Sequence, residues 1–175
     1  MRSDTNQMKT SMRSDYCGTL READCGREVA VCGWVQRTRD LGQLIFIDLR
    51  DRTGIVQLAF DEKSDRAVFE TAAACRAEFV LRAAGTVRER SSKNKDIPTG
   101  DIEIEVRTLE VLARSDTPPF AIEENSSVND TLRLKYRYLD LRRPDMQRAL
   151  AIRHKVVKVC RDYFDEQGFL EIETP

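Results

Sequence analysis

The sequence lacks the marks of a membrane, secreted or metal-binding protein. No stretch approaches the ~20 apolar residues of a membrane span, and the first ten residues are polar, unlike a signal peptide. The five cysteines form no Cys-x-x-Cys pair and the single histidine is His154, so we expect no metal site. An odd number of cysteines favours free, buried thiols in a reducing compartment, and we expect a cytoplasmic protein.

Several catalytic and binding signatures are also missing. The chain has no glycine-rich phosphate loop, no Gly-x-Ser-x-Gly, and no His/Cys or His/Ser pairing at a usable spacing. Its net charge of −1 excludes a protein that binds nucleic acid over a uniformly basic surface, so any such site must be a local patch. The 175 residues, 34% of them charged and 41% hydrophobic, are typical of a globular domain with an appendage.

Alternating residues between positions 28 and 60 predict three antiparallel strands, broken by turn residues at 40–42 and 51–54. In the middle strand Ile45, Ile47 and Leu49 share one face, which we interpret as a core face. In the third strand Val56, Leu58 and Phe60 form the apolar set. We also place Trp34 in the core.

The opposite faces of these strands carry side chains suited to unpaired nucleic acid. Phe46 lies among charged residues, Arg37 and Arg39 share a face of the preceding strand, and Gln57 projects from the following one. A ring can stack a base, arginines can hold phosphates and an amide can read a base edge. Each residue taken singly is as well explained as an ordinary surface or rim residue.

The next elements complete a mainly β domain. A spacing of three to four predicts a helix over 61–76, capped near Asp61 or Ser64. Strands follow at 78–90, where Gly85 allows a bend or bulge, and at 101–112, where Glu103 points outward. Five strands with one helix between the third and fourth match the OB fold, a small barrel that commonly binds oligonucleotides.

Composition predicts four regions along the chain. Residues 1–15 are a disordered leader, 16–114 the barrel domain, 115–143 a linker or hinge with a short helix at 131–141, and 144–175 the start of a further domain. That start comprises a long helix over 145–167, ended by Gly168, and an alternating strand over 169–175. The apolar stripe of the helix is wider than packing on one surface requires, so part of it should meet another partner.

Several motifs together resemble bacterial-type aspartyl-tRNA synthetases. They are Cys-Gly-Trp-Val at 32–35, Ile-Phe-Ile-Asp-Leu-Arg-Asp at 45–51, Leu-Lys-Tyr-Arg-Tyr-Leu-Asp-Leu-Arg-Arg-Pro at 134–144 and Gly-Phe-Leu-Glu-Ile-Glu-Thr-Pro at 168–175. The resemblance implies an OB-fold anticodon-binding domain, a hinge, and a class II catalytic domain that begins with a long helix and the strand called motif 1.

The resemblance also implies partners. The parent enzyme would attach aspartate to a tRNA whose anticodon reads GUC, using ATP and Mg²⁺, and would form a homodimer through the motif 1 region. The expected dimer-interface residues are Val156, Val159, Tyr163, Phe169 and Pro175. The chain ends before segments that match motifs 2 and 3, so we assign no catalytic residue or cofactor to this fragment and expect it to be inactive by itself.

Specific RNA-binding roles follow from the same resemblance. Phe46 would be the stacking platform, Gln57 the reader of the central U and Glu103 the partner of the C. The chemistry agrees, because a carboxylate accepts from the exocyclic amine of cytosine and repels a uracil carbonyl. The phosphate contacts would come from four arginines: Arg37, Arg39, Arg88 and Arg90.

Two other functions stay open. The chain could be a stand-alone RNA-binding OB module, or part of a related synthetase for asparagine or lysine. The Leu41–Gly42 pair resembles the loop of enzymes selective for the aspartate tRNA.

Overall fold

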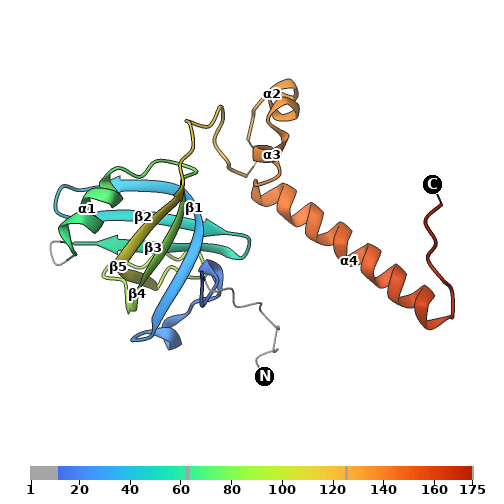
Figure 1. The fold of residues 1–175 in the computed structure, drawn as a ribbon, viewed down its shortest axis with the longest axis horizontal. Helices are drawn as coiled ribbons and strands as arrows, with labels where there is room; N and C mark the ends of the chain where they lie inside the picture. The colour runs from blue at the N-terminus through green and yellow to red at the C-terminus, as the bar shows by residue number, and fades with distance from the viewer. Residues whose placement is uncertain (1–11, 62–63, 125, 175) are drawn as a thin grey trace. The chain divides into compact units, whose positions relative to one another are not determined.

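The structure, a computed structural model, describes residues 12–61, 64–124 and 126–174. The chain divides into two compact units, the first up to Pro118 and the second from Pro119 (Figure 1). The predicted hinge, 115–143, begins close to this division. Residues 1–11 of the predicted leader lie outside the described residues, whereas Ser14 hydrogen-bonds with the backbone of Ala30.

The first unit is the predicted five-stranded barrel. Its strands are β1 (Glu28–Asp40), β2 (Ile45–Asp51), β3 (Gly54–Phe60), β4 (Val80–Glu89) and β5 (Ile102–Ala113), with helix α1 (Arg66–Ala73) between β3 and β4. They close in the order β1-β2-β3-β5-β4. Every pairing is antiparallel except that of β3 with β5. The predicted OB element order is therefore confirmed.

The barrel core follows the predicted alternation. Ile45, Ile47 and Leu49 of β2 are fully buried, as are Val56, Leu58 and Phe60 of β3. Each such side chain contributes about 1.5–3 kcal/mol by leaving water. Two short 3₁₀ turns before the barrel, Cys17–Thr19 and Glu22–Asp24, add Cys17 and Leu20 to the same core.

The prediction for Trp34 was wrong. In β1 the buried residues are Val29, Val31, Gly33 and Val35, and Trp34 lies half-buried on the outer surface. Both alternating sets of this strand are apolar, so the sequence does not say which one faces inward. Closure of the barrel decides the inward face: the valine set packs in the core cluster with side chains such as Ile47 and Leu81, whereas Trp34 lies opposite Arg50 and Val80 on the outer face.

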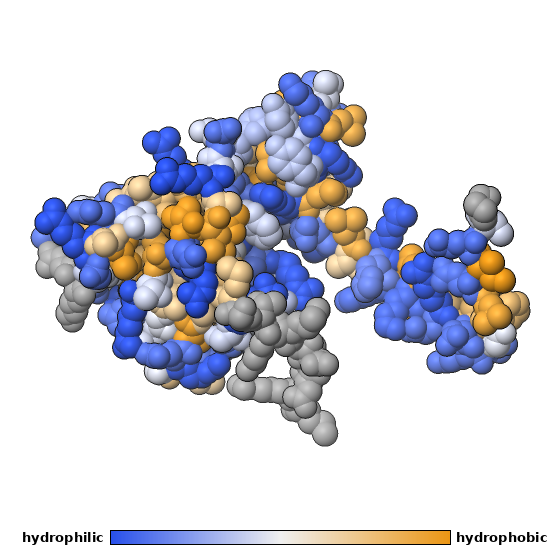
Figure 2. Space-filling view, in the orientation of Figure 1, coloured by the Kyte–Doolittle hydropathy of each residue, from blue (hydrophilic) through white to orange (hydrophobic). Residues whose placement is uncertain are grey.

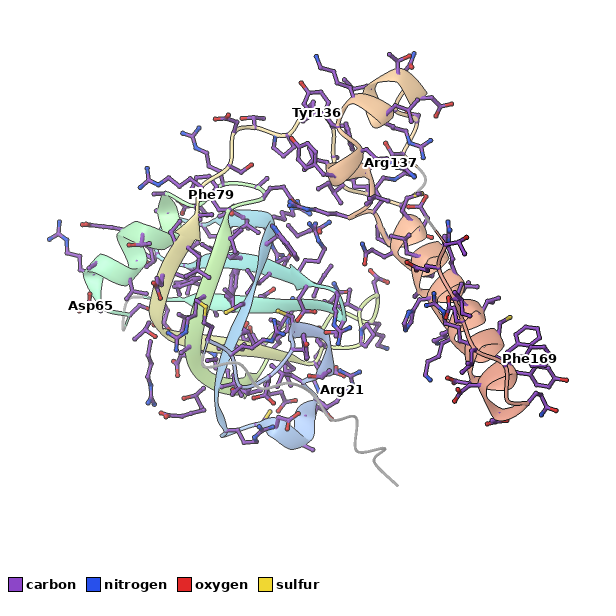
Figure 3. The ribbon with its side chains drawn as sticks, turned by 45° about the vertical axis from the view of Figure 1, so that its right-hand side comes forward. Arg21, Asp65, Phe79, Tyr136, Arg137 and Phe169 are labelled. Atoms are coloured by element: carbon purple, nitrogen blue, oxygen red, sulfur yellow. The ribbon has the colours of Figure 1, made fainter. Side chains whose placement is uncertain are left out.

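Helix α1 is shorter than predicted. Its N-cap is Asp65, not Asp61 or Ser64, and the Asp65 carboxylate accepts a hydrogen bond of 2.8 Å from the backbone N–H of Ala67 (Figure 3). Ala72 and Cys75, three residues apart, are buried against the barrel, in agreement with the spacing that predicted the helix. The bulge at Gly85 is confirmed by a register shift between Ala84 and Gly85.

The cysteines differ in accessibility. Cys17 and Cys75 are buried, but Cys25 and Cys160 are exposed, so the expectation of buried thiols was wrong for these two. Burial raises the pKa of the Cys75 thiol to about 11. It also raises the pKa of Cys17 well above its ordinary value.

The second unit contains three helices, α2 (Asp130–Lys135), α3 (Arg137–Asp140) and α4 (Pro144–Glu166). The single helix predicted over 131–141 is broken at Tyr136, whose φ of −110° and ψ of 47° are not helical (Figure 3). The break lets Leu139 pack with Phe120 and Ile122 in a small core. Pro144 begins α4, and Gly168 follows it with a φ of +81°.

Asp140 lies at the centre of an ionic cluster in the same unit. Its side chain is fully buried and accepts hydrogen bonds from Arg133 (3.0 Å), Arg137 (2.5 Å) and Arg143 (3.0 Å). Arg143 also binds Asp145 at 2.8 Å and the backbone carbonyl of Glu123 at 3.1 Å. One buried carboxylate thus holds together three arginines of the predicted hinge.

The end of the described chain differs from prediction. Residues 169–174 form no strand, because no described segment supplies ladder hydrogen bonds to them. No residue of α4 is buried. Among the described helices, none combines the length and apolar character needed to cross a membrane.

Candidate nucleic-acid interface

The barrel brings the predicted RNA-binding side chains together in two cross-strand rows. In the first row Arg37 lies opposite Asp48, followed by Gln57, Glu103 and Arg88. In the second, Arg39 lies opposite Phe46, followed by Ala59 and Glu105. We call the functional side chains of these rows the recognition face: Arg37, Arg39, Phe46, Asp48, Gln57, Arg88, Glu103 and Glu105.

Glu103 is buried at the centre of the recognition face, with only 5% of its surface exposed. One carboxylate oxygen accepts from Arg88 Nε and the other from Gln57 Nε2, both at 2.8 Å. A buried carboxylate is costly unless donors compensate for its lost hydration. These two donors allow Glu103 to remain buried and charged within the recognition face.

Arg39 orients the amide of Gln57. Its Nη2 donates to Gln57 Oε1 at 2.8 Å, while the Gln57 amide nitrogen donates to Glu103. Because Arg39 can only donate and an ionised carboxylate can only accept, the network defines which end of the amide is which. The Arg39 guanidinium also lies 5.7 Å from the centre of the Phe46 ring and 3.4 Å from Asp48.

The recognition face is not a basic patch. Arg88 contacts Glu103 (2.8 Å), Glu105 (2.7 Å) and Asp61 (3.6 Å). Burial lowers the pKa of Arg88, but the hydrogen bond and charge of Glu103 and the charges of Glu105 and Asp61 raise it above its ordinary value. Arg88 and Arg39 are therefore engaged with carboxylates and are less available to phosphates than the sequence indicated.

The remaining predicted arginines are placed differently. Arg37 is exposed, and Arg90 is half-buried just past β4, with its backbone N–H bonded to Asp101 at 2.9 Å. Neither forms an ion pair with a described carboxylate. Asp48 and Glu105 were not among the predicted site residues, although alternation places them on the same faces as Phe46 and Glu103. Their pairing with arginines depends on register across strands.

A second predicted surface, for dimerisation, lies along the last turns of α4. Val156, Val159, Tyr163 and Phe169 are each 56–66% exposed, and Pro175 lies outside the described residues. Phe169 packs its ring against Phe164 at 5.6 Å between centres (Figure 3). Figure 2 shows the resulting apolar surface at the C-terminal end of α4.

Comparison with known proteins agrees with this division of the chain. Residues 29–112 match the family described as the OB-fold nucleic acid binding domain, and residues 129–175 match class II tRNA synthetases (D, K and N). An aspartate–tRNA ligase of Ruminiclostridium cellulolyticum is 57% identical over 165 residues, which are 93% of this chain and 28% of that protein. The chain belongs to the bacterial aspartate–tRNA ligase family. It spans less than a third of the length of the relatives that it matches.

Two further members of the comparison extend this result. An aspartate–tRNA(Asp/Asn) ligase of Symbiobacterium thermophilum is 54% identical, covering 93% of this chain and 28% of its own length. A solved structure of an aspartyl-tRNA synthetase from Entamoeba histolytica, 21% identical, superposes with a TM-score of 0.78 over 88% of this chain and 37% of that one, which shows a common fold.

The two parts of this member of the aspartate–tRNA ligase family match two different family models. The recognition face lies in the OB-fold match, and α2 to α4 lie in the class II match. Within residues 12–61, 64–124 and 126–174, no group of three or more His, Cys, Asp or Glu side chains could hold a metal ion.

Proposed function

We propose that this chain is the anticodon-binding part of an enzyme that attaches aspartate to its tRNA. The observation that carries the proposal is the network of Glu103, Gln57 and Arg39 beside the Phe46 ring. It combines a stacking surface, an amide with defined orientation and a carboxylate within one small area. These are the groups with which proteins read unstacked RNA bases.

Each base-reading role has a chemical basis in this network. Phe46 would stack a base of the loop, Gln57 would present an acceptor and a donor to the central U, and Glu103 would accept from the amine of the C. Arg39 and Arg88 would hold Gln57 and Glu103 in position. Arg37 and Arg90, which have no described carboxylate partner, would contact the phosphates.

Replacement of Phe46 by alanine tests the stacking role. We expect Phe46→Ala to weaken binding of an anticodon stem-loop reading GUC by about 1–3 kcal/mol, because the ring supplies the surface on which a base stacks. The affinity would be measured by fluorescence anisotropy with labelled RNA. Phe164→Ala, the same change in α4, is the control and should leave the affinity unchanged. Equal affinities for the two variants would remove Phe46 from the interface.

The activity of the whole enzyme forms part of the proposal. It would use ATP and Mg²⁺ and act in the cytoplasm, and we assign that ATP and Mg²⁺ chemistry to no residue of this chain. A second candidate is an enzyme that also charges the asparagine tRNA, as the name of the Symbiobacterium relative suggests. Leu41 is exposed in the loop between β1 and β2. Its resemblance to the loop of enzymes selective for the aspartate tRNA favours a selective enzyme. A loop with C replaced by U would bind much more weakly to a selective protein.

We also propose that α4 and residues 169–175 mediate homodimer formation. No residue of α4 is buried, and its exposed side chains include Val156, Val159 and Tyr163. An exposed apolar surface of this kind favours association with a second copy of the chain. Val159→Lys should therefore lower the mass measured by sedimentation equilibrium towards that of a monomer. His154→Lys adds the same charge on the side of α4 opposite Val156 and Tyr163, and should leave the mass unchanged. A wild-type chain that is monomeric at high micromolar concentration would contradict the proposal.

A further inference from the structure

A small pocket lies on the barrel outside the recognition face. Its volume is about 230 Å³, and it is lined by residues from four segments: Arg13, Tyr16, Trp34, Asp51, Arg52 and Val80. Trp34 pairs with Arg50, which lies two residues after Asp48 in β2 and therefore on the same face of that strand. The pocket thus continues the outer surface of β1 and β2 towards the β2–β3 turn.

Two arginines in this pocket share a single aromatic partner. The Arg13 and Arg52 guanidiniums lie 4.2 and 5.0 Å from the centre of the Tyr16 ring. Both donate to the Tyr16 hydroxyl, at 2.8 and 3.4 Å. Tyr16 is only 8% exposed and carries no charge that could neutralise them. Two adjacent cations on one ring repel each other, and an anion between them would relieve that repulsion.

Other polar groups agree with an anion site. Within the described residues Arg13 Nε is buried without a hydrogen-bond partner, so the Arg13 guanidinium is incompletely compensated by the protein. Asp51 is the one acidic lining residue, but its oxygens accept from the backbone N–H of Cys17 and from the N–H and hydroxyl of Thr53 at 2.6–2.7 Å. The Asp51 carboxylate is therefore committed to the turn.

Trp34 adds a flat aromatic surface beside the arginines. It is half-buried and is the single tryptophan of the chain. Arginine beside an aromatic ring is a combination that binds the phosphate and base of a single-stranded nucleotide. Because inorganic phosphate has no base to stack on the Trp34 indole, the combination favours a nucleotide over inorganic phosphate.

The charges of the recognition face explain why RNA binding would need a further cationic site. There Arg39 and Arg88 are paired with Asp48, Glu103 and Glu105, so little positive charge faces an RNA backbone. RNA affinity normally depends on cations that displace the counterions of phosphates. One OB fold contacts about 4–16 nucleotides, and Arg52 follows Phe46 by only six residues, a span of at most roughly 20 Å.

We propose that the pocket formed by Arg13, Tyr16, Trp34 and Arg52 binds a phosphate of single-stranded RNA, with the adjoining base on Trp34. The proposal rests on the RNA-binding function proposed above. The pocket would supply sequence-independent affinity, while the recognition face would supply base discrimination.

The fluorescence of Trp34 tests the proposal directly in the full 175-residue chain. The probes are a GUC anticodon stem-loop, a stem-loop with C replaced by U, a nucleoside 5′-monophosphate and inorganic phosphate. We expect Trp34 emission to change with both RNAs at low concentration, with the monophosphate only at much higher concentration, and with inorganic phosphate least. A monophosphate that binds as tightly as RNA would assign the pocket to free nucleotides and overturn the RNA assignment.

Arg52→Gln is the decisive variant, because Arg52 is exposed on a turn and its change should not affect folding. We expect it to weaken both stem-loops equally, by roughly tenfold, and to reduce the slope of log K against log salt by about 0.7, the value for one phosphate contact. Arg66→Gln, which changes another exposed arginine at the start of α1, is the control and should change neither quantity.

The outcomes separate this proposal from the anticodon proposal. If Arg52→Gln matches Arg66→Gln in affinity and salt slope while Phe46→Ala still weakens binding, the pocket is a structural clamp and the present proposal is wrong. If binding depends on Arg52 but not on Phe46 or on the base sequence, the anticodon assignment fails and the phosphate site stands. The proposed phosphate site would also be overturned if none of the four probes changed the fluorescence of Trp34.

Discussion

Asp140→Asn is expected to unfold the α2–α3 region while the barrel stays folded. The change keeps the side-chain volume but removes the charge that holds Arg133, Arg137 and Arg143. Breaking a buried ionic cluster by removal of one partner costs about 3–5 kcal/mol, because the remaining charges are left uncompensated. Hydrogen exchange read by mass spectrometry would show faster exchange of peptides within 130–143 and unchanged exchange of β1 to β5.

Asp145→Asn is the matched control for this prediction. Asp145 contacts only Arg143 in this cluster and is partly exposed, so its loss should cost no more than about 1 kcal/mol. If both variants showed the same exchange, Asp140 would not be the centre of the cluster.

The same cluster implies a pH dependence. Burial raises the pKa of Asp140, but hydrogen bonds and charges of Arg133 and Arg143 outweigh burial and leave the pKa below its ordinary value of 3.8. A carboxylate with a depressed folded-state pKa stabilises the fold above its unfolded pKa, and this contribution disappears as the pH falls through the folded value. The stability difference between wild type and Asp140→Asn should therefore be full at neutral pH and shrink below about pH 4. A difference that did not vary with pH would contradict this account.

Glu103→Gln is expected to reduce discrimination between C and U in the anticodon loop. The carboxylate accepts from the cytosine amine, whereas the amide can also donate to the uracil carbonyl. We expect the preference for a GUC loop over a loop with C replaced by U to fall by about 1–3 kcal/mol. The variant also places an amide donor against Gln57 Nε2 or Arg88 Nε, so some loss of thermal stability should accompany it.

Glu105→Gln separates specificity from general loss of charge. Glu105 binds the same Arg88 at 2.7 Å, but its side chain is 37% exposed and forms no described bond with Gln57. It should keep the wild-type preference for C. A Glu103→Gln protein with undiminished preference would exclude Glu103 as the reader of the C, and equal losses in both variants would assign the effect to Arg88.

The predictions from sequence succeeded where a local period carried the information. Alternation placed Ile45 and Ile47 inside and Phe46 outside, and the element order indicated the barrel. They failed where distant partners decide the outcome. Trp34 sits on the outer surface because packing selects the valine face of β1. The 131–141 segment breaks at Tyr136, since Leu139 packs against Phe120 and Ile122.

The sequence by itself determined which side chains of each strand share a face, because residues two apart in a strand point the same way whatever the strand pairs with. It also determined the family. Only the tertiary structure decided that Gln57 and Glu103, 46 positions apart, would bond through the parallel pairing of β3 with β5. The tertiary structure also decided that Arg39 bonds to Gln57 and Arg88 to Glu103, because cross-strand neighbours depend on the register at which the barrel closes.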